Sequence, residues 1–246
     1  MIDMINGGWK MVFYTGDKHG REERLMRYIR VHDLTKEDVI VILGDAGFNY
    51  SGYERKNSND RIVKETLCRT GVTIFSIHGN HEMRPETLPY YHEKEWSGGI
   101  VYAEDEYPNV IFAKDGEIYD LDGHKAIAIG GAYSVDKYYR LERGYRWFED
   151  EQPSATVKAH VEDVLTSLDW TIDTVITHTC PARYIPTEAF LPMVDQSTVD
   201  NSTEEWLDEI ESRLHYKHWL CGHWHINKRI DKLRFLMDDL ITLDNI

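Results

Sequence analysis

The fold is decided by one stretch of sequence, residues 72–82, which reads Val-Thr-Ile-Phe-Ser-Ile-His-Gly-Asn-His-Glu. Its first six residues form an apolar run that is typical of a buried strand. In open α/β sheets ligands bind at the edge where the strands end, so Asn80 and His81 are expected at the rim of a binding site. Asn80 offers a neutral amide oxygen that suits a hard metal ion. His81 can hold or release a proton near neutral pH.

The chain before this stretch repeats the same order of apolar strand, polar tip and helix. Strands are predicted over residues 11–15 and 39–43, and helices over residues 22–31 and 61–69, the second helix with Ile62 and Leu67 on one side. The two strands run into Gly16-Asp17-Lys18-His19 and into Gly44-Asp45. This alternation is typical of α/β layers in which neighbouring strands are parallel.

The middle of the chain departs from this order. Short β-prone runs separated by turns lie at residues 100–102, 109–113, 117–121 and 125–129, and an aromatic and basic stretch follows at 132–150. Beyond it, helices are predicted over 153–168 and 203–214, strands over 174–177 and 218–221, and a closing hairpin over 228–237. The acidic residues of the 203–214 helix, Glu204 included, are expected on a solvated face. We therefore expect a single domain over residues 1–246 with a β-rich insert, containing arginines and aromatics, at about 84–152.

The composition is that of a globular chain of 246 residues, 41% of them apolar and 29% charged. The net charge of −15 repels nucleic-acid backbones and anionic lipid surfaces, so neither extended nucleic-acid binding nor a membrane partner is expected. No stretch approaches the roughly 20 consecutive apolar residues that span a bilayer, and residues 1–10 lack a signal-peptide pattern. Three cysteines without a framework spacing favour free thiols and a cytoplasmic location.

Five predicted strand ends carry polar side chains that can bind metal. The candidate ligands are Asp17, His19, Asp45, Asn80, His178, His223 and His225. Nitrogen and oxygen donors in this mixture suit borderline divalent ions such as Mn, Fe, Co, Ni or Zn. One ion cannot take seven side chains, but two ions that share a carboxylate can. Within Asp-x-His and His-x-His the residues lie two apart, so in extended segments both side chains would point the same way.

The ordered set D-x-H, G-D, G-N-H-E, H and G-H-x-H, from Asp17 to His225, resembles the pattern of the calcineurin-like metallophosphoesterase superfamily. All five blocks are present in the expected order, so the resemblance covers most of the chain. It implies an α/β fold in four layers, α/β/β/α, in which two mixed β-sheets are flanked by helices. It also implies two divalent metal ions, of which Mn is the one we expect first and Fe, Zn, Ni and Co are alternatives.

The resemblance implies a role for each matching position. The first metal would be held by Asp17, His19 and His225, the second by Asn80, His178 and His223, and Asp45 would bridge the two. His81 would bind no metal and would lie over the substrate phosphate as the catalytic residue. The protein Ser/Thr phosphatase branch carries aspartate and arginine where this chain has Phe48 and Asn49, so protein phosphatase activity is not expected.

The reaction implied is hydrolysis of a phosphoester by a hydroxide that bridges the metals. A small or nucleotide-like substrate is expected, and a phosphodiester is favoured over a monoester because the insert is rich in arginine and aromatic residues. A nuclease acting on nucleic-acid ends and a non-catalytic metal-binding module of the same fold are the alternatives. Arg84, Arg143 and Arg146 are candidate substrate-binding residues. The alternative for Arg84 is a surface salt bridge, and for the other two a packed subdomain or a subunit interface.

Overall fold

The structure is a computed structural model that describes residues 11–52 and 58–245. Residues 1–10, for which the sequence predicts no signal peptide, lie outside the described ranges. Among the helices of these ranges, none combines the length and the apolar character needed to cross a membrane.

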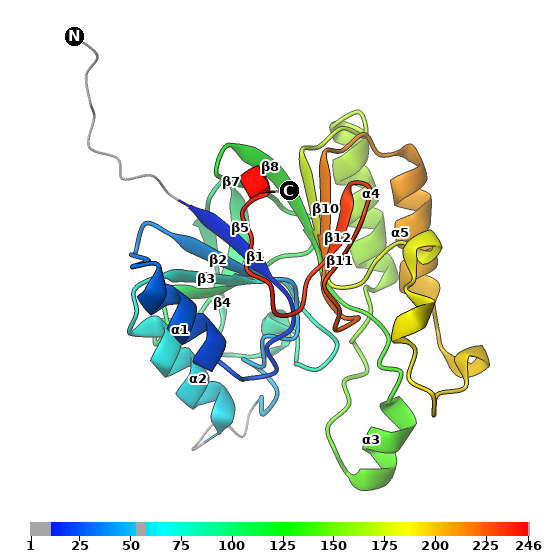
Figure 1. Ribbon diagram of the computed structural model, residues 1–246, viewed down its shortest axis with the longest axis horizontal. Coiled ribbons are helices and arrows are strands. Elements are labelled where there is room, and N and C mark those ends of the chain that lie inside the picture. Colours follow the sequence, from blue (N-terminus) through cyan, green and yellow to red (C-terminus); the bar gives the residue numbers. More distant parts are fainter. Residues whose placement is uncertain (1–10, 53–57, 246) are drawn as a thin grey trace.

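Two six-stranded mixed sheets form the centre of the molecule (Figure 1). The first has the order β1-β2-β3-β6-β5-β4, with strands Val12–Thr15, Val39–Ile42, Thr73–Ser76, Val110–Ala113, Gly99–Ala103 and His92–Trp96. The second has the order β11-β12-β10-β9-β8-β7, with strands Lys228–Ile230, Leu233–Phe235, His218–Cys221, Thr174–Thr177, His124–Ile129 and Ile118–Leu121. The strands that carry the motif residues are parallel within each sheet.

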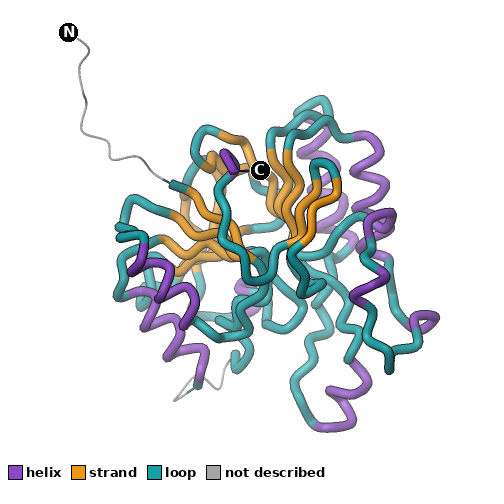
Figure 2. The backbone as a smooth tube through the Cα atoms, viewed as in Figure 1, coloured by secondary structure: helices purple, strands orange, loops and turns teal. Residues whose placement is uncertain are grey.

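Helices cover the outer faces of the two sheets, and Figure 2 shows them on either side of the paired strands. Helices α1 (Glu23–Val31) and α2 (Asn59–Cys68) lie beside the first sheet, and α4 (Ala155–Ser167) and α5 (Ser202–Arg213) lie beside the second. An apolar core that includes Val41, Phe75 and Leu220 joins the facing sheets. The predicted sandwich of two mixed sheets flanked by helices is confirmed.

The elements predicted from apolar runs are present within one or two residues of their expected bounds. Among the strands and α-helices of the described ranges, strand β4 and helix α3 (Lys137–Arg143) were not predicted. Strand β4 reads His-Glu-Lys-Glu-Trp and lies at the sheet edge, paired with β5. The β-rich stretch from about residue 84 to 152 supplies strands to both sheets, and α3, which buries none of its residues, projects from them (Figure 1).

Helix α2 turns a different face inward from the one predicted. Leu67 is buried but Ile62 is 54% exposed, so the prediction that the two share one side is wrong, whereas Lys64 is 1% exposed. The Lys64 ammonium reaches the buried Glu104 carboxylate and also donates to Asn49 Oδ1 at 2.9 Å. The inward face of the helix therefore carries Lys64 together with the apolar Val63 and Leu67.

Candidate metal centre

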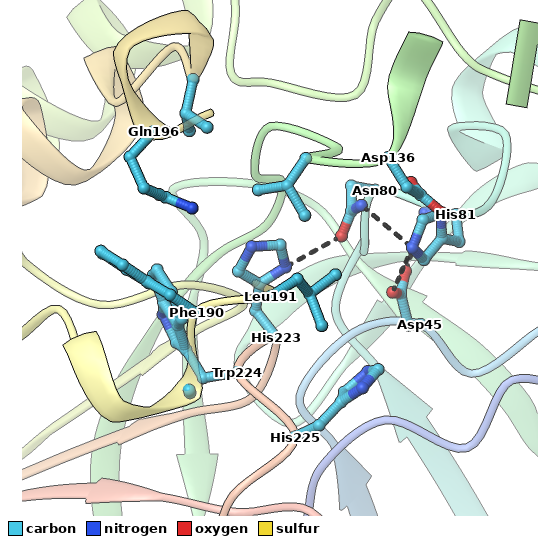
Figure 3. Close-up of a pocket in the computed structure, with 13 residues that line it drawn as sticks. Asp45, Asn80, His81, Asp136, Phe190, Leu191, Gln196, His223, Trp224 and His225 are labelled. Carbon is cyan, nitrogen blue, oxygen red and sulfur yellow. Dashed lines mark hydrogen bonds and ion pairs between the residues drawn. The ribbon is translucent and has the colours of Figure 1, made fainter. Parts of the chain in front are cut away.

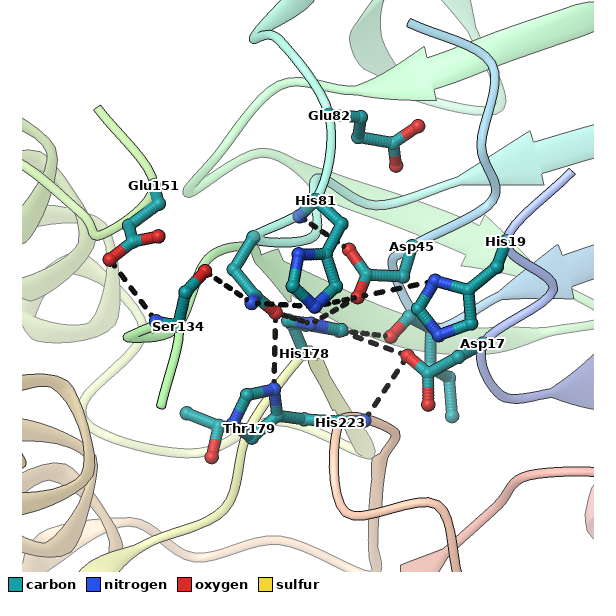
Figure 4. Close-up of polar contacts among 12 residues, drawn as sticks. Asp17, His19, Asp45, His81, Glu82, Ser134, Glu151, His178, Thr179 and His223 are labelled. Carbon is teal, nitrogen blue, oxygen red and sulfur yellow. Dashed lines mark hydrogen bonds and ion pairs between the residues drawn. The ribbon is translucent and has the colours of Figure 1, made fainter. Parts of the chain in front are cut away.

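All seven predicted ligands lie just beyond the carboxyl ends of parallel strands. Asp17 and His19 follow β1, Asp45 follows β2, Asn80 follows β3, His178 follows β9, and His223 and His225 follow β10. Because the two sheets face each other, the five strand ends converge on one centre (Figure 4).

Four of these residues adopt a left-handed backbone conformation that side chains other than glycine rarely take. The φ angles are 47° at His19, 49° at Asp45, 64° at His223 and 52° at His225. Strained residues of this kind cost about 1–3 kcal/mol each and gather at functional sites. His-x-His is therefore not extended, because His223 and His225 are both left-handed, and in Asp-x-His the chain turns at His19.

Two motif glycines are required by close packing. A Cβ atom on Gly44, where φ is +90°, would lie 2.1 Å from His178 Nδ1. One on Gly79 would lie 2.0 Å from Asp45 Oδ1. Both positions therefore exclude any side chain if the ligands beside them are to stay in place.

One group of donors forms around Asp17, His19 and His225. The Nε2 atoms of the two histidines are 3.0 Å apart, and His225 Nε2 lies 3.9 Å from Asp17 Oδ2. Asp17 Oδ1 accepts a hydrogen bond from the backbone N–H of His223, whereas the buried Oδ2 accepts none from the residues that the structure describes. Burial raises the pKa of Asp17 to about 6, against the effect of the nearby His178 ring. A buried carboxylate oxygen without a hydrogen bond fits a cation at this point.

A second group forms around Asn80, His178 and His223. Asn80 Oδ1 lies 2.8 Å from His178 Nε2 and 3.1 Å from His223 Nδ1. His178 Nδ1 is 2.7 Å from the carbonyl oxygen of Leu43, which fixes the neutral ring with its proton on Nδ1 and a lone pair on Nε2. With the ring in this form, Asn80 Oδ1 and His178 Nε2 are both acceptors 2.8 Å apart, an arrangement that fits a cation bound beside them. Burial disfavours a charged His178 ring, but the carboxylates of Asp45 and Asp17 outweigh burial and raise its pKa. A positive charge at this point, whether a proton on His178 or a bound ion, is therefore stabilised by the two carboxylates.

Asp45 lies between the two groups. Its Oδ2 is 3.6 Å from His178 Nε2 and 3.9 Å from His19 Nδ1, and its Oδ1 accepts from the backbone N–H of His81 at 2.8 Å. Ligand atoms of Asp17, Asp45 and His178 all lie within 4.8 Å of one another. Burial works against an ionised Asp45, but the rings of His81, His178 and His19 hold its pKa well below its ordinary value. This position fits a carboxylate shared by two ions.

His81 lies beside the donor groups and 18% of its side chain is exposed. Its Nε2 is 3.3 Å from Asn80 Nδ2, 3.3 Å from Arg140 Nη2 and 3.9 Å from Asp45 Oδ2. Burial lowers the pKa of the His81 ring; Arg140 adds to this shift and Asp45 opposes it. The ring therefore faces the space in front of the donors, where a substrate would approach.

Comparison with known proteins agrees with this geometry. The model of the calcineurin-like phosphoesterase family matches residues 11–227. The chain belongs to this family. Membership supports metal-dependent hydrolysis of phosphoesters and a hydrolase that uses divalent metal ions. The resemblance stated from the sequence is thereby confirmed, and Asp17, Asp45 and His178 form a candidate site for such an ion in this phosphoesterase.

Solved structures share the fold of this phosphoesterase at low sequence identity, and 22 chains match it. Phosphopantetheinyl hydrolase from Mycobacterium tuberculosis is 15% identical, with a TM-score of 0.50 and coverage of 94% of this chain and 89% of that chain. The protein TT1561 of Thermus thermophilus is 11% identical, with a TM-score of 0.49 and the same two coverages. A comparison with curated proteins finds no significant match.

Ser134 and Glu151 support the centre of the phosphoesterase and were not predicted from the sequence. Asn80 Nδ2 donates to Ser134 Oγ at 2.8 Å, and the Ser134 backbone N–H donates to Glu151 Oε1 at 3.1 Å. The first contact turns the amide so that its oxygen faces the two histidines. A sequence signal did exist, because the strand predicted over residues 125–129 runs into Gly130-Gly131, just as the strands with predicted ligands run into glycine-containing motifs.

The three candidate substrate-binding arginines have different surroundings, and none of them lines the two cavities at Asp45 and His81. Arg84 is 6% exposed, and its guanidinium donates to Asp115 Oδ2 at 2.7 Å and to the Asp150 carbonyl at 2.8 Å. Arg143 is exposed, with its guanidinium carbon 5.5 Å from the centre of the Tyr139 ring. Arg146 supplies a carbonyl oxygen 3.4 Å from Arg140 Nη1.

Arg140, from the same aromatic and basic stretch, is the arginine that reaches His81. Its Nε lies 2.8 Å from both carboxylate oxygens of Asp136, which holds the guanidinium in place. It lines a cavity of about 590 Å³ together with His19, Asp45 and His81. A second cavity, of about 190 Å³, also contains Asp45 and His81 in its lining (Figure 3). The two cavities therefore meet at the same pair of residues.

Proposed function

We propose that this phosphoesterase is a dinuclear metal enzyme that hydrolyses a small or nucleotide-like phosphoester, most readily a phosphodiester. The observation that carries the proposal is the convergence of seven donors in two groups that share Asp45, with His81 beside them. The Asp17 oxygen that accepts no hydrogen bond from the described residues and the close pair of acceptors on Asn80 and His178 both fit bound cations. Manganese is the expected ion, and iron, zinc, nickel and cobalt suit the same donors.

Asp17, His19 and His225 would hold one ion, Asn80, His178 and His223 the other, and Asp45 both. Bound divalent ions would supply Lewis acidity and lower the pKa of water enough to give a nucleophile at neutral pH.

The chain's own residues would bind and orient the phosphate and move a proton. His81 Nε2 is the atom expected to face a phosphate oxygen and to pass a proton to the leaving oxygen. The Arg140 guanidinium, oriented by Asp136, is expected to bind a second phosphate oxygen. Such a local positive charge is needed because the chain as a whole carries −15 and would repel an anionic substrate.

Two features support a diester of limited size. Cavities adjoin Asp45 and His81 on two sides, so a phosphate bound there could carry a substituent in each. The overall negative charge disfavours a long nucleic acid. Because Cys68, Cys180 and Cys221 are free thiols, the proposed compartment is the cytoplasm.

The test is hydrolysis of bis-p-nitrophenyl phosphate and p-nitrophenyl phosphate by protein stripped of metal and refilled with Mn, Fe, Zn, Ni or Co. We expect two metals per chain and faster cleavage of the diester. His81→Ala should keep both metals and lose about 10²–10⁴-fold in kcat, whereas His215→Ala, at an exposed position, should match the wild type. Metal bound at two per chain without cleavage of either ester would contradict the proposal, and so would loss of metal from the His81 variant.

A further inference from the structure

A cavity of about 190 Å³ opens from the metal centre towards residues 189–199 (Figure 3). At one end it is lined by metal-ligand candidates and by His81. The rest of its lining is largely apolar and aromatic, with one amide and one carboxylate, and consists of Val135, Asp136, Ala189, Phe190, Leu191, Gln196, Val199 and Trp224. An apolar recess beside a charged centre is the usual form of a pocket that binds the organic part of a ligand.

We propose that this cavity binds the organic substituent of the substrate, and that this substituent is a single planar aromatic or heteroaromatic ring close to the phosphorus. This inference rests on the proposed function, since it assumes that the phosphate lies at Asp45 and His81. It adds the chemical class of the group that the phosphate carries.

The aromatic wall favours a flat ring. The rings of Phe190 and Trp224 have centroids 6.1 Å apart and an angle of 33° between their planes. Trp224 lies between two ligand candidates in the chain, and its indole N–H donates to Thr179 Oγ1 at 3.2 Å. The ring is therefore held at a fixed distance from the metal centre, and it presents with Phe190 a surface on which another ring can stack.

The size of the cavity limits the ring. A closed apolar cavity of about 150 Å³ is enough to hold benzene. The present cavity, about 190 Å³, has room for one six-membered ring with a small substituent.

Gln196 favours a ring with a polar edge. Figure 3 shows its side chain reaching into the cavity across from Phe190 and Trp224. Its amide can both donate and accept hydrogen bonds, and its contact with the Val194 carbonyl is long at 3.5 Å. A heteroaromatic ring and an aryl ring with a polar substituent share the chemistry that this arrangement recognises.

The experiment measures binding of phenylphosphonate, cyclohexylphosphonate and methylphosphonate to the metal-loaded protein by calorimetry, so it does not depend on turnover. We expect phenylphosphonate to bind about tenfold more tightly than methylphosphonate and more tightly than cyclohexylphosphonate. Phe190→Leu, which keeps an apolar side chain but removes the ring, should abolish the preference for phenyl and leave methylphosphonate binding unchanged. Met193→Ala, at a 95% exposed position of the same segment, should change neither affinity.

Equal affinity for phenyl and methyl phosphonates would overturn the proposal. Equal affinity for phenyl and cyclohexyl would overturn the planar ring, and a Phe190 variant that weakens both ligands equally would overturn the role of the aromatic wall. A further pair of ligands, 4-pyridylphosphonate and phenylphosphonate, tests the polar edge, since Gln196→Leu should lower the affinity for the pyridyl compound only. Failure to hydrolyse model esters would instead contradict the proposed function, so the two failures are distinguishable.

Discussion

Replacing Ser134 with alanine is expected to weaken metal binding, although Ser134 is not itself a candidate ligand. The Ser134 hydroxyl accepts the 2.8 Å hydrogen bond from Asn80 Nδ2, and both residues are buried. This bond keeps Asn80 Oδ1 directed at His178 and His223. Without it, the amide can rotate and the second donor group loses its fixed oxygen.

Two independent arguments give a similar size for the loss of metal-binding free energy. A buried donor left without its acceptor costs about 1–3 kcal/mol. Removal of a hydrogen-bond partner of a metal ligand typically lowers metal affinity by about 10–100-fold, which is about 1.4–2.8 kcal/mol. We therefore expect Ser134→Ala to weaken the ion at Asn80 by about 10–100-fold. An ion at the other proposed site, that of Asp17, His19 and His225, should be affected much less.

Competition with a chromophoric chelator for Mn²⁺ measures the two affinities separately. Ser134→Thr keeps a hydroxyl and should retain more of the affinity than alanine. Ser167→Ala, which removes an exposed hydroxyl at the end of α4, is the matched control. If Ser134→Ala keeps both metal affinities within about twofold of the wild type, the hydrogen bond from Asn80 to Ser134 does not orient Asn80 as a metal ligand, and the prediction is wrong.

Three further changes test the structure elsewhere. Gly79→Ala should displace Asp45, because the new Cβ would lie 2.0 Å from Asp45 Oδ1. The metal content measured by mass spectrometry should then fall below two ions per chain. A Gly79→Ala variant with full metal content and full activity would refute this prediction. Lys64→Met should lower the free energy of unfolding, measured in urea, by about 3–5 kcal/mol, because it removes the ammonium that the buried Glu104 carboxylate faces. Adding Glu104→Leu should restore much of this loss. A Lys64→Met variant as stable as the wild type would contradict the prediction. Burial raises the pKa of Glu204 from 4.5 to about 7, so the folded protein holds a proton that the unfolded chain releases. Stability should therefore fall between pH 4.5 and 7 by up to about 1.4 kcal/mol per pH unit, and Glu204→Gln should flatten that slope; an unchanged slope would show that another group is responsible.

The parts of the fold that could be predicted are those that depend on local pattern. Buried strands such as β2 and β3 read as continuous apolar runs, and each ends in a motif with its own glycine. Strand β4 has no such pattern, because four of its five residues are exposed and it exists by pairing with β5. Helix α3 likewise buries no residue that a periodic pattern could reveal.

The remaining errors concern contacts between residues far apart in the sequence. The sequence favours a solvated Glu204, yet this residue is 3% exposed and accepts from Thr179 Oγ1 at 2.7 Å. Arg140 and Arg143 look alike in the sequence, but only Arg140 has Asp136 one helical turn before it to direct the guanidinium towards His81. The spacing of Asp136 and Arg140 can be read in the sequence, but the contacts of Arg140 with His81 and of Glu204 with Thr179 depend on how the elements pack.

The order of the motif histidines shows how local backbone strain divides the donors between the two groups. In an extended His-x-His segment both rings would lie on one side and would serve the same ion. Here His223 and His225 both have positive φ. The backbone N–H of Trp224 donates a hydrogen bond of 2.7 Å to the Gly222 carbonyl and closes the turn between the two histidines. His223 Nδ1 thereby faces Asn80, while His225 Nε2 faces His19.

Left-handed residues and backbone hydrogen bonds also arrange the donors that follow β1 and β2. The backbone N–H groups of Lys18 and His19 both donate to the Asp45 carbonyl, at 3.0 and 2.7 Å, and His19 and Asp45 are both left-handed. At about 1–3 kcal/mol for each strained residue, these turns persist only because the surrounding sheets and hydrogen bonds hold them. The fold therefore bears the cost of arranging the donors in advance, so a metal ion that enters meets ligands already in position.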